Sequence, residues 1–318
     1  MDTLIIFGGF LVGLILLVKG ADEMVKSAIQ IAVKFKLPNS IIGATFIGFG
    51  TSAPELFAST GAAINGDLSL GIGNIIGSNI ANSLLVLAVL YLFIDKSYQK
   101  KININQISPV WMMILTTIFV STYILTNQFP FILGIVLLSL VVFVTYKMVT
   151  EEAVDEEELV TEERNFIWLR GVIAIATTIF GSTLVVDNAI AIAELFNISS
   201  LIVGVTIIAI GTSLPEVAGA ISAARLKKPD LVMGNVFGSN LFNIGLVGGS
   251  AIIIEPGEIA SNIDYQMFLM YFASFLAVLL TRYVIKRNIV LGVIFLLIYF
   301  GFISVSYTHL TLPTICSV

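Results

Sequence analysis

The sequence nearly lacks the residues that build redox, zinc and nucleophilic sites. Its one cysteine is Cys316 and its one histidine is His309, and both follow the last apolar run. A disulfide needs two cysteines, structural zinc usually takes four Cys or His ligands, and a Ser-His triad needs a histidine beside its nucleophile. The composition therefore excludes disulfide scaffolds, Cys/His zinc sites, haem ligation and serine triads from the body of the chain.

Charge is also scarce. Only 12% of the 318 residues are charged, 57% are hydrophobic, and the mean hydropathy is +1.01. Soluble domains carry about 25% charged residues, so a soluble fold is excluded. The apolar runs are continuous rather than alternating, which favours transmembrane helices over the strands of a barrel. The sequence predicts an all-α polytopic membrane protein.

Ten apolar segments can each span a bilayer. No basic residues precede the first one, so no cleavable signal peptide is expected. The polar tail at 307–318 is interpreted as a disordered end or as sequence foreign to the native protein. The ten segments lie near 3–35, 38–64, 68–93, 107–126, 129–149, 166–195, 199–224, 231–254, 265–285 and 289–306.

Basic residues predict the orientation. All of the 16 Lys and Arg residues except Lys19 and Lys26 fall in the odd-numbered connections between segments. Cytoplasmic loops carry the excess of Lys and Arg. We therefore expect the odd loops in the cytoplasm, both termini outside, and the chain in the plasma (inner) membrane. The net charge of −5 comes from an acidic run at 151–163, which we interpret as a solvated loop.

The chain contains an internal repeat at an offset of 161 residues. IIGATFIGFGTSAPE at 41–55 matches IVGVTIIAIGTSLPE at 202–216, and the following GN and GSN motifs match at the same offset. Five spans in each half give the halves opposite orientations, as in inverted-repeat transporters. The predicted units are a first repeat at 1–150 (motif region about 40–93), an acidic loop at 151–165 and a second repeat at 166–306 (motif region about 201–254).

Two glutamates occupy equivalent positions near mid-span. Glu55 and Glu216 each follow Gly-Thr-Ser-x-Pro, and no Lys or Arg is placed at mid-span to pair with them. An ionisable group there costs about 2.5 to 3.5 kcal/mol on insertion scales, which points to a functional site. Pro54 and Pro215 should break their helices, because proline lacks an N–H and clashes with the carbonyl four residues earlier. Broken helices at membrane depth line cavities or lie buried in protein.

The segments that follow the broken helices carry a second polar pattern. Ser78 and Asn82 are four residues apart and share one helix face, and the second repeat has the same pair. The glycines of each segment are spaced as GxxxG, which lets helices approach closely. Carboxylates, hydroxyls, amides and freed carbonyls are all oxygen ligands, which suit hard cations such as Ca²⁺. A site charge of −2 can be balanced by one Ca²⁺, by Na⁺ or by protons, and this competition is the basis of exchange.

GTSAPE and GTSLPE, each followed by GN and GSN motifs, resemble the two α-repeats of the calcium/cation antiporters, and of the prokaryotic sodium/calcium exchangers in particular. The resemblance covers about residues 1–306. It implies ten helices in two inverted repeats of five, and alternating access by movement of the first and sixth helices against a fixed core.

The resemblance also implies a ligand set. Glu55 and Glu216 would bind Ca²⁺ with backbone oxygens of Thr51 and Thr212. Sodium sites would use hydroxyls and two carbonyls, namely Ser52, Ser78, Ser213, Ser239 and the carbonyls near Gly48 and Ala209. Asn82 and Asn243 fill the remaining polar positions. In the exchangers that the sequence resembles, one residue of this pair is an aspartate, so the sodium stoichiometry and any potassium dependence stay open.

The predicted function is secondary active exchange of Ca²⁺ for Na⁺, with no cofactor and no enzymatic activity. The expected partners are the two ions and the lipid bilayer, with no nucleic acid and a monomeric transport unit. A Ca²⁺/H⁺ exchanger, a K⁺-dependent exchanger and a passive channel remain alternatives. An intramembrane enzyme with Ser52 or Ser213 as nucleophile is a remote one, because no base is placed beside them. Asp22, Glu23 and Asp187 are interpreted as solvated charges at the interface.

Overall fold

A computed structural model of the protein describes residues 3–94, 107–151, 165–196, 211, 213–259, 263–280 and 289–315. The helical elements of the first half are α1 Thr3–Phe35, α2 Asn39–Ile42, η1 Gly43–Ile47, α3 Gly48–Thr51, α4 Ala53–Ile64, α5 Leu68–Ala81, η2 Asn82–Val86, α6 Leu87–Phe93, α7 Ile107–Thr126 and α8 Phe131–Glu151, where η marks a π-helix. Those of the second half are α9 Ile167–Leu195, α12 Leu214–Arg225, α13 Pro229–Phe242, η5 Asn243–Gly248, α14 Gly249–Ile254, α15 Asp264–Leu280 and α16 Ile289–Ile315.

The predicted all-α membrane fold is confirmed. Six helices in the described ranges are individually long and apolar enough to cross a membrane, and the pair formed by α2–α3 and α4 passes the same test together. The apolar helices α15 and α16 and the largely buried α12 correspond to the remaining expected segments. Large apolar side chains such as Leu4, Leu125 and Leu297 are mostly exposed, as the lipid-facing surface of a membrane protein requires.

The end of the chain differs from the expected disordered tail. Helix α16 continues to Ile315, beyond the predicted end of its apolar segment at residue 306. Hydropathy falls after that point because threonines replace the aliphatic residues, but the helical backbone does not depend on an apolar side chain at every position.

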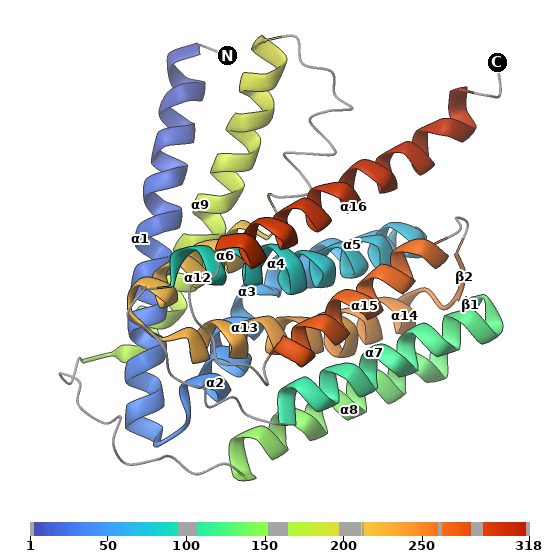
Figure 1. The fold of residues 1–318 in the computed structure, drawn as a ribbon, viewed down its shortest axis with the longest axis horizontal. Helices are drawn as coiled ribbons and strands as arrows, with labels where there is room; N and C mark the ends of the chain where they lie inside the picture. The colour runs from blue at the N-terminus through green and yellow to red at the C-terminus, as the bar shows by residue number, and fades with distance from the viewer. Residues whose placement is uncertain are drawn as a thin grey trace.

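Helices α1 and α9 form a pair that lies across the direction of most other helices (Figure 1). Small residues let the two backbones touch: a Cβ added to Gly181 would lie 2.4 Å from the backbone nitrogen of Leu17, and one added to Gly20 would lie 2.6 Å from the hydroxyl of Thr178. Gly20 and Gly181 are equivalent in the repeat. The first and sixth segments therefore pack together as one unit with symmetric contacts.

The centre of the molecule is α13, which packs on the broken helix of the other half. A Cβ on Gly234 would lie 2.1 Å from the carbonyl oxygen of Ser40, and one on Gly238 would lie 2.2 Å from that of Ala44. The GxxxG motif of the second half thus serves the close helix packing that its spacing predicts. The partner segment that the repeat assigns to Gly73 and Gly77 falls in 201–210, outside the described residues.

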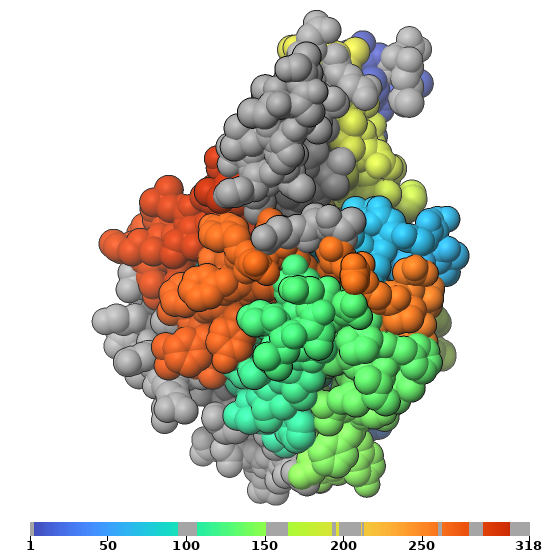
Figure 2. All heavy atoms as spheres, turned by 90° about the vertical axis from the view of Figure 1, so that its right-hand side faces the viewer, coloured from blue at the N-terminus to red at the C-terminus, as the bar shows by residue number. Residues whose placement is uncertain are grey.

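A two-stranded antiparallel sheet links one loop of each half. Strands β1 (Gln128–Phe129) and β2 (Gly257–Glu258) pair Gln128 with Glu258 and Phe129 with Gly257. The side-chain amide of Gln128 donates to Glu258 Oε1 at 3.0 Å. Helices α7 and α8 lie side by side on this side of the molecule, with α15 next to α7 (Figure 2).

Candidate ion site

The structure describes a backbone break in front of Glu55, and in the second repeat it describes the helix start that precedes Glu216. Helix α3 ends at Thr51 and α4 begins at Ala53, with a bend of 45° between them. Ser52 has φ −80° and ψ 1°, and Ser213 at the start of α12 has φ −94° and ψ 5°. Pro54 and Pro215 stand in the first turns of α4 and α12. The break predicted from Pro54 is confirmed, and α12 begins at the place predicted from Pro215.

Glu55 and Glu216 are both buried, at 1% exposure each. Each lies in the first turn of its helix, directly after the break. Their carboxyl groups are close enough to interact electrostatically with each other. The two predicted glutamates thus lie within electrostatic range of each other. Within the described part of the chain, no group of three or more Asp, Glu, Cys and His residues could hold a metal.

Hydroxyl groups of both halves surround the first break. Ser78 Oγ donates to Glu55 Oε1 at 3.5 Å, and the hydroxyls of Thr51 and Ser239 are 3.5 Å apart. Ser239 Oγ also lies 3.4 Å from the carbonyl oxygen of Gly48. These distances are at the long end of the hydrogen-bond range, so the hydrogen bonds between these oxygens are weak. Five of the predicted ligand residues, from α3, α4, α5 and α13, thus form two contacting groups.

Most of the buried polar atoms that lack a hydrogen bond belong to the predicted ligands. Among the described residues 14 buried side-chain N or O atoms have no partner, and nine of these come from six predicted residues. Buried polar atoms normally have a partner, so this concentration suits a site that binds an ion. The six residues are Ser52, Glu55, Asn82, Ser213, Glu216 and Asn243.

Asn82 and Asn243 each begin a π-helix. Segments η2 and η5 start at these two residues, which are equivalent in the repeat, and both side chains are buried. Short π-helical turns are rare and are frequent at functional sites. The spacing of the polar side chains predicts that the two asparagines belong to the site, but it does not predict the π-helical turns.

Two predicted residues cannot be placed. Thr212 and Ala209 lie outside the described residues. Sequence reasoning also missed Asn79 and Asn240, which belong to the GSN motifs. The amide of Asn240 donates to Ser83 Oγ at 2.8 Å and that of Asn79 to the sulfur of Met270 at 3.8 Å, so both contacts join the two halves. Their repetition in the sequence was the available signal.

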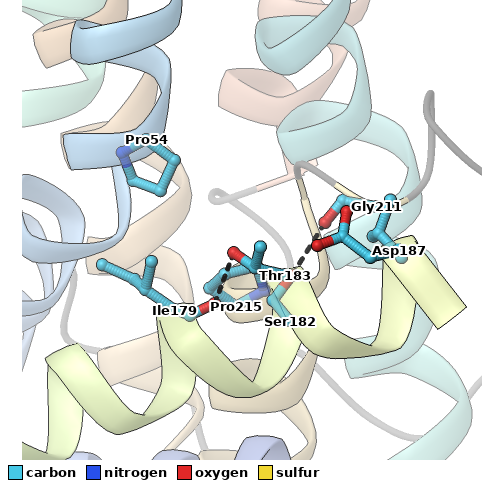
Figure 3. Close-up of a pocket in the computed structure, with 8 residues that line it drawn as sticks. Pro54, Ile179, Ser182, Thr183, Asp187, Gly211 and Pro215 are labelled. Carbon is cyan, nitrogen blue, oxygen red and sulfur yellow. Dashed lines mark hydrogen bonds between the residues drawn. The ribbon is translucent and has the colours of Figure 1, made fainter. Parts of the chain in front are cut away.

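A cavity of about 150 Å³ is lined by α9, by Gly211 and by the first turns of α4 and α12. Figure 3 shows residues from α9 and from both breaks around it. Asp187 lines this cavity and is exposed, so it stands beside the site rather than only at the membrane interface. Glu23 instead forms an ion pair with Arg170 at 3.2 Å, which links α1 to α9. The cavity lining includes Pro54, Ser182, Thr183, Asp187, Gly211 and Pro215.

Comparison with known proteins adds independent information. Residues 5–149 and 166–308 match the family described as sodium/calcium exchanger protein. The putative antiporter CaxA of Alkalimonas amylolytica is 35% identical over 92% of this chain and 95% of its own length. The inner membrane protein YrbG of Escherichia coli is 34% identical over 82% of this chain and 84% of its own. A solved structure of the sodium-calcium exchanger NCX_Mj, soaked with Na⁺ and Ca²⁺, superposes with a TM-score of 0.81 at 31% identity and covers 96% of this chain and 99% of that one.

Proposed function

Because the chain belongs to the sodium/calcium exchanger family, we propose that it exchanges Ca²⁺ for Na⁺ across the membrane by alternating access. The family and the fold are those of an integral membrane cation antiporter, not of an enzyme. The observation that carries the proposal is the burial of Glu55 and Glu216, each at the start of its helix, among polar side-chain atoms that lack a hydrogen bond.

The two carboxylates supply the charge that binds Ca²⁺. Two bidentate carboxylates provide about four of the six to eight oxygens that Ca²⁺ prefers, and backbone oxygens of Thr51 and Thr212 add to them. Sodium ions bind at hydroxyls and carbonyls around the same glutamates, with Asn82 and Asn243 completing the polar shell. The proposed sodium ligands are Ser52, Ser78, Ser213, Ser239 and the carbonyls near Gly48 and Ala209.

Shared ligands make the two ions compete. When Na⁺ occupies the hydroxyl positions and neutralises the glutamates, Ca²⁺ loses the charge that holds it, and the reverse holds when Ca²⁺ is bound. Alternating access then follows from movement of α1 and α9 together, since their backbones touch and they lie across the core. The protein works in the plasma (inner) membrane as a monomeric unit of two repeats, at 1–150 and 166–306, with both termini outside.

A flux measurement tests the coupling ion. Purified protein in proteoliposomes loaded with Na⁺ should take up radioactive Ca²⁺ when external Na⁺ is removed, and dissipating the Na⁺ gradient should stop uptake. Uptake that follows only a pH gradient contradicts the sodium assignment and supports Ca²⁺/H⁺ exchange. Uptake that needs K⁺ as well supports a K⁺-dependent exchanger, which the two asparagines at 82 and 243 leave open.

A further inference from the structure

One hydrogen bond connects the long helix α9 to the break of the second repeat. Ser182 Oγ donates to the carbonyl oxygen of Gly211 at 3.0 Å, and Figure 3 shows this bond at the wall of the cavity. Gly211 lies four residues before Pro215, which has no N–H to offer it. The side chain of Ser182 therefore donates to a carbonyl oxygen that lacks the usual backbone partner four residues later.

In the first repeat the equivalent carbonyl oxygen has a different donor. Backbone N–H groups at the end of α3 bond the carbonyl oxygens of Gly48 and Gly50, where Gly50 is the equivalent of Gly211. The equivalent of Ser182 is Ala21, whose side chain cannot donate. The bond from a long helix to a freed carbonyl is thus a property of the second repeat, and the sequence repeat alone could not predict it.

The contact of α9 with the first break is apolar. A Cβ on Gly50 would lie 2.5 Å from the Cδ1 atom of Ile175, so this isoleucine packs directly on the glycine. An apolar contact of this kind has no fixed partner atom and persists through small displacements, whereas a hydrogen bond weakens steeply with distance and angle. Of these two contacts, the bond from Ser182 is the one that holds α9 at a defined position.

The bond also lies next to the proposed ion site. Gly211 precedes Ser213 by two residues and Glu216 by five, and the cavity lies beside it and α9. If α9 moves along the core, Ser182 leaves the carbonyl oxygen of Gly211 and this oxygen turns to the cavity. A buried carbonyl without a donor is unfavourable, so the bond favours the arrangement in which it is formed.

We propose that Ser182 is a positioning residue that holds α9 at Gly211, just before α12, and that α9 releases the Gly211 carbonyl when it moves between access states. This proposal rests on the alternating access of the proposed function. It assigns the control of that movement to one side chain of the second repeat.

The test measures the position of α9 relative to the core. Spin labels are attached at Phe180→Cys on α9 and Phe57→Cys on α4, both of which are exposed, in a Cys316→Ser background. Distance distributions are recorded in liposomes at the Na⁺ and Ca²⁺ concentrations at which the otherwise unsubstituted protein populates two distances. Ser182→Ala should lower the ratio of the described arrangement to the other by about two- to tenfold, the range expected for one hydrogen bond.

Two further variants separate positioning from packing. Ser182→Thr keeps the hydroxyl and should restore the ratio. Thr183→Val removes the neighbouring hydroxyl, which lines the same cavity but donates to the carbonyl of Ile179 in its own helix at 3.2 Å, and should leave the ratio unchanged. An unchanged ratio in Ser182→Ala, or equal shifts in Ser182→Ala and Thr183→Val, overturns the proposal. A single distance under every ion condition overturns it as well, because α9 then does not move.

Flux in the same liposomes distinguishes this proposal from the proposed function. If the distances shift as expected but Na⁺ does not drive Ca²⁺ uptake, the coupling assignment fails and the role of Ser182 stands. If Na⁺ drives uptake and the distances do not respond to Ser182→Ala, the role of Ser182 fails and the exchange activity stands.

Discussion

At the scale of single residues, the two glutamates carry the charge of the proposed site. Both are buried, and the oxygens around them are neutral hydroxyls, amides and carbonyls. A neutral ligand can complete the coordination of Ca²⁺ but cannot replace the charge that offsets the loss of the ion's hydration shell. Removal of either charge should therefore affect Ca²⁺ more than any change among the hydroxyls.

We expect Glu55→Gln and Glu216→Gln each to reduce Ca²⁺ uptake to background while the protein still inserts and purifies as a single species. A loss of about 100-fold in apparent affinity corresponds to about 2.8 kcal/mol of binding free energy. Ca²⁺ flux and Ca²⁺ binding by calorimetry measure the effect. Glu258→Gln, at the β1–β2 pair, is the control and should transport normally. Retained transport in both site variants contradicts the ligand assignment.

The negative charge of Asp187 should speed the approach of Ca²⁺ to the proposed site. It is exposed in the cavity beside both breaks, and a negative charge at such a place raises the local concentration of cations. Asp187→Asn is expected to raise the Ca²⁺ concentration for half-maximal uptake by about two- to fivefold at low ionic strength, and by less at high salt because the charge is then screened. Asp187→Glu keeps the charge and should behave as the unsubstituted protein. A salt-independent effect would contradict the steering role.

At the scale of helical elements, the sequence predicts some features and misses others for physical reasons. Pro54 and Pro215 mark the breaks because proline acts on its own helix, and the spacing of Gly234 and Gly238 marks close packing because backbone contact needs two small residues on one face. The widened turns at Asn82 and Asn243 have no such local cause. The bond from Ser182 depends on which residue of a distant helix reaches Gly211, and no spacing in the sequence encodes it.

Close packing of α13 leads to a stability prediction. In Gly238→Ala the new Cβ would lie 2.2 Å from the carbonyl oxygen of Ala44, so a backbone must shift, and we expect a loss of about 1 to 3 kcal/mol. Gly61→Ala is the matched control, since no described atom lies within 4 Å of its added Cβ, and it should be neutral or slightly stabilising. Thermal unfolding in detergent measures both, and equal midpoints would contradict the packing argument.

At the scale of the whole molecule, the distribution of Lys and Arg predicts which loops face the cytoplasm. In a Cys316→Ser background, Asn65→Cys should react with an impermeant maleimide added outside intact cells, because its loop carries no basic residue. Lys36→Cys, in the first connection, should react only after the membrane is permeabilised. The reverse pattern would invert the predicted orientation and place the termini in the cytoplasm.

The packing of α13 against the broken helix of the first half also has a consequence for how the protein is made. The backbone at Ser40 and Ala44 packs on Gly234 and Gly238, and strand β1 pairs with β2. Each half therefore covers surface of the other. A ribosome that adds 5 to 20 residues per second needs roughly 10 to 40 s to pass from Ala44 to Gly238. During that interval the surface at Ser40 and Ala44 lies in the bilayer without its partner helix. Insertion of the eighth segment, which contains α13, covers it. Each half of this duplicated chain thus completes its packing only when the other half is present.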